Sequence, residues 1–188
     1  MIMKLKLIAI ALISILSGCK SGSKSDIPNS SNSNVALANK FIDAFYSFNE
    51  DTLKSTLNKA MASQPSILYY QKWAECANYE IFERNDFIMK SDSLISCPIT
   101  VKDDLMGALN IDFNVTDSFH ISILNNQIVS VQTTSNDLDV YYEAKDWVKA
   151  NQPELIEVPC IGIWEDGPTP CECVNGMVKG FSLFTAAK

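Results

Sequence analysis

Residues 119–129 read Phe-His-Ile-Ser-Ile-Leu-Asn-Asn-Gln-Ile-Val, and this stretch is the most informative about the fold. Apolar and polar residues alternate up to the Asn-Asn pair, and an apolar pattern resumes after it. A period of two is typical of a half-buried strand, and asparagine tolerates the positive φ of a tight hairpin turn. The stretch therefore predicts two antiparallel strands joined by a turn at Asn125 and Asn126.

Similar apolar patterns occur on both sides of this hairpin. They predict further strand structure over residues 78–89, 94–101, 109–115 and 128–134. In residues 109–115 the apolar face would consist of Leu109, Ile111, Phe113 and Val115. These strands are close together in the sequence and contain no βαβ unit, so the sheet is expected to be antiparallel.

Helical spacing of apolar residues dominates the rest of the chain. Asn34 and Asn49 are good N-cap residues for two helices, and residues 66–75 favour a short third helix before the sheet. Residues 135–137 are expected to cap another helix, which runs to about residue 150. Residues 174–187 are apolar enough for a last packed helix. Helices, then a sheet, then helices predict an α+β fold.

Three segments resemble nuclear transport factor 2-like (SnoaL-like) domains: the helical segment at 36–46, the segment at 49–53 and the hairpin at 119–129. The resemblance covers about residues 35–155. It implies a cone-shaped (cystatin-like) roll, with N-terminal helices packed on a curved antiparallel sheet around a pocket. A C-terminal helix and a cysteine-bearing tail would follow. The superfamily includes isomerases, dehydratases, polyketide cyclases, transport adaptors and binding proteins, so the fold alone does not choose a function.

The amino-terminal residues are typical of an export signal. Two lysines precede the apolar run at residues 7–16, which is too short to span a bilayer. The run ends in Leu16-Ser17-Gly18-Cys19, which resembles the bacterial lipobox. That resemblance implies cleavage between Gly18 and Cys19 and anchoring in a membrane through acyl chains on Cys19. Lys20 stands where an inner-membrane retention signal usually has aspartate, which implies the outer membrane, with the domain in the periplasm.

Composition and the two resemblances together imply four segments. Residues 1–18 are expected to be the signal peptide, 19–34 the lipidated cysteine and a flexible tether, 35–155 the SnoaL-like domain, and 156–188 a disulfide-bearing extension packed on it. The 188-residue chain has a net charge of −7, and from residue 35 onward 21 acidic residues oppose 11 basic ones. This acidity excludes a nucleic-acid binder, which needs a basic face, and suits neutral or cationic ligands.

Five cysteines remain when Cys19 is assigned to lipid: Cys76, Cys97, Cys160, Cys171 and Cys173. Disulfides are expected in an exported protein, and an odd count leaves at least one thiol unpaired. A Cys76–Cys97 bridge would tie the entry of the sheet to its second strand. Cys160 is expected to pair with Cys171, with Cys173 as the close alternative, because either bridge closes a loop rich in glycine and proline.

Metal binding is the competing interpretation of the tail. Soft ligands for zinc or copper could come from Cys160, Cys171, Cys173 and His120. Their spacing does not match a zinc motif, and an exported protein meets oxidising conditions. The sequence therefore predicts structural disulfides, with no metal and no cofactor.

The candidate catalytic residues are Asp112, Asp117 and His120. A His-Asp pair can perform general acid–base chemistry, and His120 is the only histidine. Strand parity, however, places His120 on the polar face, away from a pocket, and Asp117 at a turn or irregular step. The acidic pairs Asp103-Asp104 and Glu165-Asp166 are interpreted as solvated turns.

The candidate ligand-binding residues are aromatic: Tyr69, Tyr70, Trp73, Tyr79, Phe113 and Tyr141, with Trp147 in the same group. Such side chains could hold a flat apolar ligand at the mouth of a cone, or they could simply fill the core. The favoured hypothesis is a lipoprotein that binds a small apolar molecule or an envelope protein. The alternative is a SnoaL-like isomerase, cyclase or hydrolyase that uses a pocket carboxylate or histidine.

Overall fold

The computed structural model describes residues 30–163 and 170–188. The expected signal peptide, Cys19, most of the expected tether and the Glu165-Asp166 pair lie outside the described residues. In chain order the elements are α1 (Ser30–Phe45), α2 (Glu50–Thr56), α3 (Gln64–Cys76), β1 (Glu80–Arg84), β2 (Ile88–Ser91), β3 (Leu94–Lys102), α4 (Asp104–Leu109), β4 (Val115–Leu124), β5 (Gln127–Ser135), α5 (Asp139–Asn151), the 3₁₀ turn η1 (Pro153–Leu155) and α6 (Pro170–Ala186).

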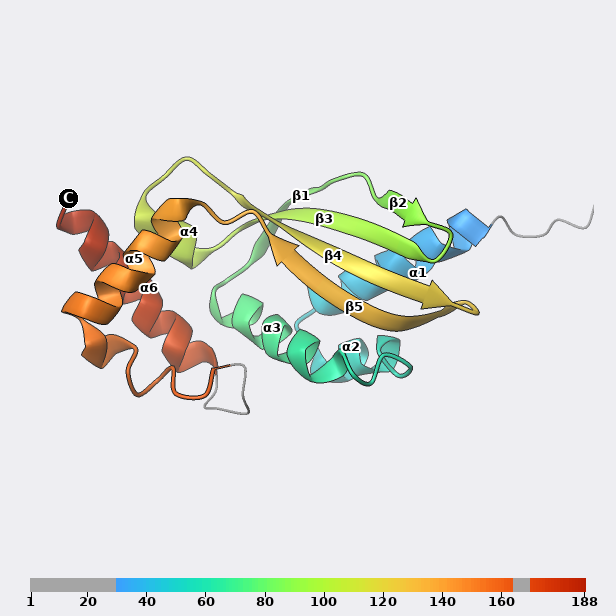
Figure 1. The fold of residues 1–188 in the computed structure, drawn as a ribbon, viewed down its shortest axis with the longest axis horizontal. Coiled ribbons are helices and arrows are strands. Elements are labelled where there is room, and N and C mark those ends of the chain that lie inside the picture. Colours follow the sequence, from blue (N-terminus) through green and yellow to red (C-terminus); the bar gives the residue numbers. More distant parts are fainter. Residues whose placement is uncertain (1–29, 164–169) are drawn as a thin grey trace, which may run out of the picture.

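The sheet is antiparallel and has five strands in the described part of the chain. Its order is β1-β3-β4-β5, and β2 pairs with the first half of β3 while β1 pairs with the second half. The predicted hairpin is confirmed, because Asn125 and Asn126 have φ values of 49° and 59° and join β4 to β5. The α+β class is also confirmed, with helices packed against the sheet (Figure 1).

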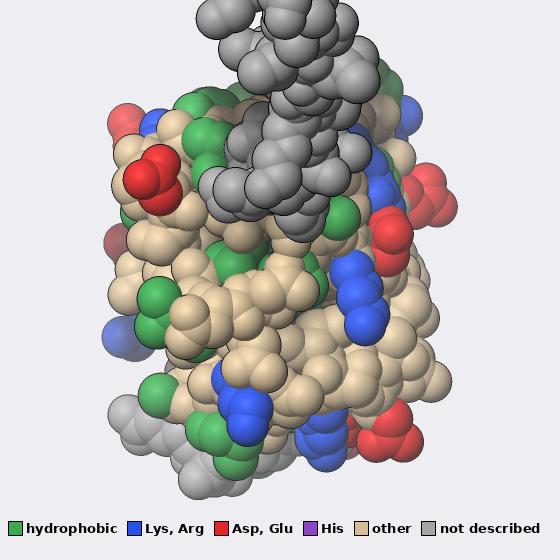
Figure 2. Space-filling view, turned by 90° about the vertical axis from the view of Figure 1, so that its right-hand side faces the viewer, with side chains coloured by type: hydrophobic (Ala, Val, Ile, Leu, Met, Phe, Trp, Pro, Cys, Tyr) green, Lys and Arg blue, Asp and Glu red, His purple; other side chains and the backbone are tan. Residues whose placement is uncertain are grey.

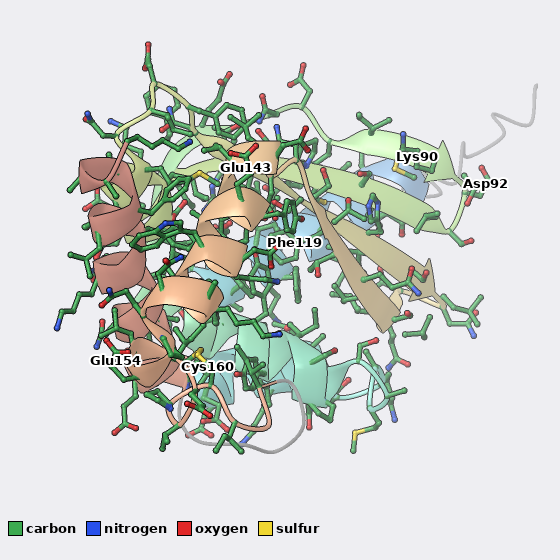
Figure 3. All side chains as sticks on the ribbon, turned by 60° about the vertical axis from the view of Figure 1, so that its left-hand side comes forward. Lys90, Asp92, Phe119, Glu143, Glu154 and Cys160 are labelled. Atoms are coloured by element: carbon green, nitrogen blue, oxygen red, sulfur yellow. A yellow bond between two sulfur atoms is a disulfide. The ribbon has the colours of Figure 1, made fainter. Side chains whose placement is uncertain are left out.

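An aromatic cluster joins α1 to the middle of the sheet. Phe119 of β4 lies between the sheet and the helices (Figure 3), with its ring centroid 5.5 Å from that of Phe41 and 4.8 Å from that of Phe45. The amide of Gln71 on α3 donates hydrogen bonds to the carbonyls of Ala44 (3.0 Å) and Phe45 (2.8 Å). These contacts pack aromatic rings between α1, α3 and the sheet in this part of the interior.

Helices α1, α2 and α3 are the first helical layer. Helices α4, α5 and α6 form a second helical layer at the end of the sheet that lies away from the β4–β5 turn (Figure 1). Helix α6 packs against α3, α4 and α5, and its Phe181 ring centroid lies 5.3 Å from that of Tyr141. Cys173, Val174, Met177 and Phe181 of this helix are buried in the same core as the sheet. No helix in residues 30–163 or 170–188 has the length and apolar character to cross a membrane.

Two elements begin where the sequence patterns did not place them. Helix α1 starts at Ser30, so Asn34 is not its N-cap and residues 30–34 are not tether. Asn34 is buried within the helix, and its side-chain amide donates to the carbonyl of Asp92 at 2.9 Å. The strand expected over residues 109–115 is also wrong. Leu109 is the last residue of α4, residues 110–114 are irregular, and β4 begins only at Val115.

The disulfide pairing differs from the expected one. Cys76 at the end of α3 is bonded to Cys171 at the start of α6, and Cys160 is bonded to Cys173. Cys97 is a buried free thiol on β3, so the Cys76–Cys97 bridge does not form. The favoured Cys160–Cys171 pair is likewise replaced by its alternative. Each bridge connects α6 to an earlier part of the chain.

The exposed end of the sheet carries charges of both signs. Figure 2 looks onto this end, and the acidic and basic side chains that are visible there lie interspersed around its margin. An ion pair between Arg84 and Asp43, with N and O atoms 2.7 Å apart, links β1 to α1 across the surface. The visible part of this face therefore carries charges of both signs and no patch of one sign.

Candidate functional site

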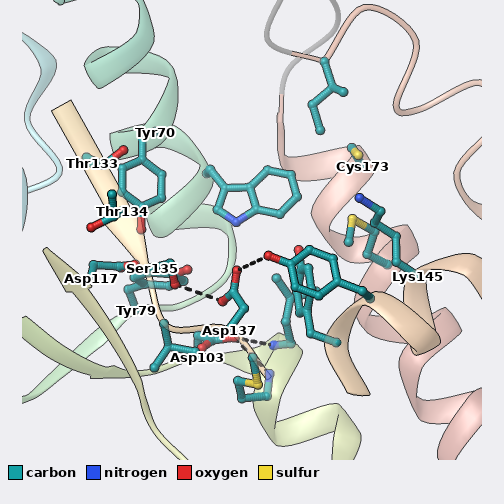
Figure 4. A pocket seen from close by; sticks show the side chains of 18 of the residues that line it. Tyr70, Tyr79, Asp103, Asp117, Thr133, Thr134, Ser135, Asp137, Lys145 and Cys173 are labelled. Carbon is teal, nitrogen blue, oxygen red and sulfur yellow. Dashed lines mark hydrogen bonds between the residues drawn. The ribbon is translucent and has the colours of Figure 1, made fainter. Parts of the chain in front are cut away.

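A cavity of about 980 Å³ lies where the sheet meets the second helical layer (Figure 4). Its walls come from α3, the start of β4, the edge strand β5, and α4, α5 and α6. Apolar side chains form much of the wall, among them Ile67, Leu105, Met106, Val131 and Met177. The volume lies within the range of small-molecule sites in proteins. The cavity therefore has the size and the apolar character of a binding site.

Asp117 is the most deeply placed polar residue of this cavity. In β4 the inward positions are Val115, Asp117, Phe119 and Ile121, so strict alternation carries the carboxyl group to the buried face. Its side chain is 2% exposed, and Oδ2 has no hydrogen-bond partner among the described residues. Burial raises the pKa of Asp117 to about 6, although a hydrogen bond from Tyr70 acts to lower it. An unpaired, buried carboxyl oxygen of this kind requires an explanation.

Asp103 supplies a second carboxyl group of the same kind. As the N-cap of α4 it accepts hydrogen bonds at Oδ1 from the backbone N–H groups of Leu105 (2.8 Å) and Met106 (3.0 Å). Its Oδ2 atom is buried and has no partner in the described part of the chain. Burial raises the pKa of Asp103 to about 6 against the lowering effect of these two hydrogen bonds. One oxygen of this carboxyl group thus caps the helix, while the other is buried on a residue that lines the cavity.

Asp137 completes an acidic cluster with these two residues. It accepts hydrogen bonds from the hydroxyls of Ser135 (2.9 Å) and Tyr142 (3.3 Å), which are drawn as dashed lines in Figure 4. Its negative charge contributes to the raised pKa values of both Asp103 and Asp117. Unlike the other two carboxyl groups, Asp137 has both oxygens hydrogen-bonded. Its charge makes the site more negative, while the oxygens without a partner among the described residues belong to Asp103 and Asp117.

Aromatic side chains surround the carboxyl groups. The rings of Tyr70 and Tyr79 have centroids 6.4 Å apart, and both hydroxyls have raised pKa values because they are buried. Trp73 and Tyr141 line the cavity from α3 and α5. Burial also raises the pKa of Tyr141. All three tyrosines are consequently neutral hydrogen-bonding groups at physiological pH.

Two basic side chains, Lys145 and Lys149, line the cavity from α5 and are exposed. The Lys145 ammonium lies 5.8 Å from the ring centroid of Tyr142. The charges that act most strongly on the buried carboxyl groups are nevertheless those of other carboxylates. Both lysines therefore belong to the mouth of the cavity rather than to its floor.

The candidate catalytic residues are separated in the structure. Asp117 lines the cavity, which corrects its placement at a turn. Asp112 is exposed in the irregular segment between α4 and β4. His120 is on the opposite face of β4, where its Nε2 atom lies 2.9 Å from the hydroxyl oxygen of Thr134. No His-Asp pair is formed by these three side chains.

Four of the aromatic candidates line the cavity: Tyr70, Trp73, Tyr79 and Tyr141. Tyr69 and Phe113 are not among its lining residues, and both pack against the core. Trp147 lies against Phe184, with ring centroids 5.9 Å apart. Some of the aromatic candidates therefore line the cavity, and the others pack against neighbouring side chains.

Sequence reasoning missed Asp103 and Asp137. Asp103 was expected in a solvated turn, but an aspartate followed by a second acidic residue is also a helix N-terminal signal. That signal predicts the cap, although not its burial. Asp137 was assigned to a helix cap, while α5 begins only at Asp139. Its position at the cavity depends on how the following helix α5 packs against α6 and α4, which local sequence does not specify.

The alternative metal site of the tail is not assembled. Cys160 and Cys173 are bonded to each other, Cys171 is bonded to Cys76, and His120 is on the outer face of the sheet. Across residues 30–163 and 170–188, no group of three or more His, Cys, Asp or Glu side chains is arranged to hold a metal ion. The sulfur atoms of the tail act as covalent links between elements.

The chain was compared with protein families, curated proteins and solved structures. No protein-family model matches the sequence, and no curated protein matches it. A solved structure that matches is a protein of unknown function with a cystatin-like fold from Xanthomonas campestris. It is 18% identical, the match covers 55% of this chain and 91% of that chain, and the TM-score is 0.39.

Proposed function

We propose that the domain binds a small, largely apolar molecule in the cavity between the sheet and the second helical layer. The observation that carries this proposal is the pair of buried carboxyl oxygens, on Asp103 and Asp117, that have no partner among the described residues. Buried polar atoms in native proteins nearly always have a hydrogen-bond partner. A ligand in an apolar cavity of about 980 Å³ would supply the missing partners.

The covalent framework around the cavity supports this proposal. Cys160 and Cys173 are lining residues and are bonded to each other, while the Cys76–Cys171 bond fixes α3 to α6 on the same side. A cavity held open by such links needs little reorganisation when a ligand enters. Preorganisation of this kind lowers the free-energy cost of binding.

Binding is tested with N-phenyl-1-naphthylamine, an apolar dye whose fluorescence rises in an apolar site. We expect saturable binding to the full chain, and loss of it in Thr133→Trp. Thr133 lines the cavity and lies opposite Phe119, so an indole there would occupy the space. The matched control is Val129→Trp, on the same strand but outside the cavity lining. Equal dye binding by both variants would contradict the proposal.

The proposed location is the periplasmic side of an outer membrane, with the domain of SnoaL-like type anchored through Cys19. The lipobox-like residues 16–19 and the apolar run before them support this location. The test is metabolic labelling with radioactive palmitate in a bacterial host, followed by fractionation. We expect label and membrane association in the wild type and neither in Cys19→Ala. Membrane association unchanged by this substitution would contradict the anchor.

The second candidate function is acid–base catalysis. It is favoured by the pKa values of Asp103 and Asp117, which burial raises to about 6. A general acid or base works best when its pKa is near the working pH. The assay is exchange of α-protons for deuterium in a panel of cyclic ketones, followed by NMR. Exchange that is faster with the wild type than with Asp117→Asn would support catalysis, and identical rates would oppose it.

A further inference from the structure

Two buried acceptor oxygens, on residues that line the cavity, have no donor in the part of the chain that the structure describes, and this restricts the chemistry of the ligand. A carboxylate oxygen can only accept hydrogen bonds, so whatever satisfies it must carry N–H or O–H groups. Oδ2 of Asp117 and Oδ2 of Asp103 are both in this state, on side chains that are 2% and 9% exposed. The two residues come from different elements, β4 and the N-terminus of α4, and converge on one cavity (Figure 4).

The charge around these oxygens is negative. Asp117 experiences the charges of Asp137 and Asp103, and Asp103 experiences those of Asp137 and Asp104. The groups that face them from α3, the segment before β1 and α5 are the neutral phenols of Tyr70, Tyr79 and Tyr141. Lys145 and Lys149 are exposed at the mouth. A neutral donor would satisfy the oxygens, but only a cation would also offset this field.

We propose that the ligand is an organic cation, namely a protonated primary amine on an apolar body, whose N–H groups donate to the free oxygens of Asp117 and Asp103. This inference rests on the proposed binding function and names its ligand class. An ammonium group has three N–H donors, enough for both carboxyl groups. The aromatic wall, with Tyr70, Trp73 and Tyr79, suits both a cation and its apolar body. The excess of 21 acidic over 11 basic residues from residue 35 onward would favour the approach of a cation.

The test compares three probes that share an indole ring and differ in charge: tryptamine, the neutral alcohol tryptophol and the anion indole-3-propionate. Affinities are measured by calorimetry on the full chain at pH 8 and at pH 5. We expect tryptamine to bind roughly 10- to 100-fold more tightly than tryptophol at pH 8, the range typical of a hydrogen bond to a charged group. The advantage should shrink at pH 5, because protonation removes the carboxylate charges.

Asp117→Asn and Asp103→Asn identify the groups responsible. Asparagine keeps an oxygen for the Tyr70 hydroxyl and for the cap of α4, but removes the charge. Each variant should lose most of the preference for tryptamine over tryptophol, and its circular dichroism spectrum and urea unfolding transition show independently that the variant is folded. The charge-matched control is Asp112→Asn, which is exposed and outside the cavity. It should keep the preference.

The other outcomes overturn the inference in distinguishable ways. Equal affinities for tryptamine and tryptophol would refute the cation while leaving small-molecule binding intact. Tightest binding of indole-3-propionate would mean that Lys145 and Lys149 dominate recognition, which also refutes it. If the wild type binds neither the naphthylamine dye nor any of the three indoles, the proposed function fails together with the inference.

Discussion

Cys76, the last residue of α3, is covalently bonded to Cys171, the second residue of α6. The bond joins positions that are 95 residues apart in the sequence, whereas Cys160 and Cys173 are separated by only 13. The first bond therefore spans the whole sheet and closes the domain on itself. The second bond fastens one wall of the cavity locally.

We expect the two disulfides to differ in their contribution to stability. In the chain-entropy model a bond that closes about 95 residues contributes roughly 4.7 kcal/mol, and one that closes about 13 contributes roughly 3 kcal/mol. Cys76→Ala/Cys171→Ala should therefore lower the free energy of unfolding more than Cys160→Ala/Cys173→Ala does. Urea unfolding of both double variants measures the difference. A larger loss from the Cys160–Cys173 pair would show that the entropy of the long loop is not the main term.

Cys97 should behave as an inert thiol. It is fully buried on β3, and burial raises its pKa to about 12, so the reactive thiolate is scarce at neutral pH. In a Cys19→Ala chain we expect no reaction with a maleimide under native conditions and one reactive thiol per chain after unfolding without reductant. Two or more thiols after unfolding would mean that one of the disulfides is not formed.

The sequence predicted the hairpin and the fold class because both depend on local patterns. Asn125 and Asn126 have the turn conformation that their residue type favours, and Phe119 and Ile121 lie on the buried face that alternation assigns to them. The same alternation extends to Asp117. The sequence pattern nevertheless predicts a turn at Asp117, because an aspartate is common at the start of a turn and rare at a buried strand position.

The rest of the site depends on long-range structure. The apolar positions of residues 109–115 fit a strand, but α4, which Asp103 caps and which packs on α6, extends to Leu109, and the left-handed Asn110 begins an irregular segment that ends at β4. The pairing of Cys76 with Cys171 joins two helices whose approach no local pattern reveals, and connectivity is not deducible from cysteine positions alone. The sequence shows which of these residues are polar or aromatic. It does not show which of them lie next to one another in the fold.

Gly176 should be the most sensitive glycine of α6. A Cβ atom there would collide with the backbone carbonyl oxygen of Leu155, which cannot move without shifting η1. We expect Gly176→Ala to lower the free energy of unfolding by about 2 kcal/mol or more. Gly107→Ala is the matched control, since a Cβ on this helical glycine of α4 meets nothing within 4 Å. It should raise stability by about 0.5–1 kcal/mol, because alanine is the better helix former. Similar effects of the two substitutions would contradict the close approach of α6 to η1.

The pH dependence of stability should reveal the burial of Asp117. Its pKa is about 6 in the folded chain and 3.8 as the ordinary value, so between these pH values the folded state holds a proton that the unfolded state has released. Stability from this group is therefore highest near pH 4 and falls as the pH rises toward 6. The full effect is on the order of 3 kcal/mol.

Asp117→Asn removes this titration, so the stability of the variant relative to the wild type should increase as the pH rises from 4 to 7.5. Urea unfolding at a series of pH values measures the difference. Asp103→Asn should show the same direction, because burial raises the pKa of Asp103 to about 6 as well. Asp112→Asn, at an exposed position, is the control and should differ from the wild type by a constant amount. If Asp117→Asn also differs by a constant amount, Asp117 is not buried in the cavity, and the binding site proposed around it is refuted.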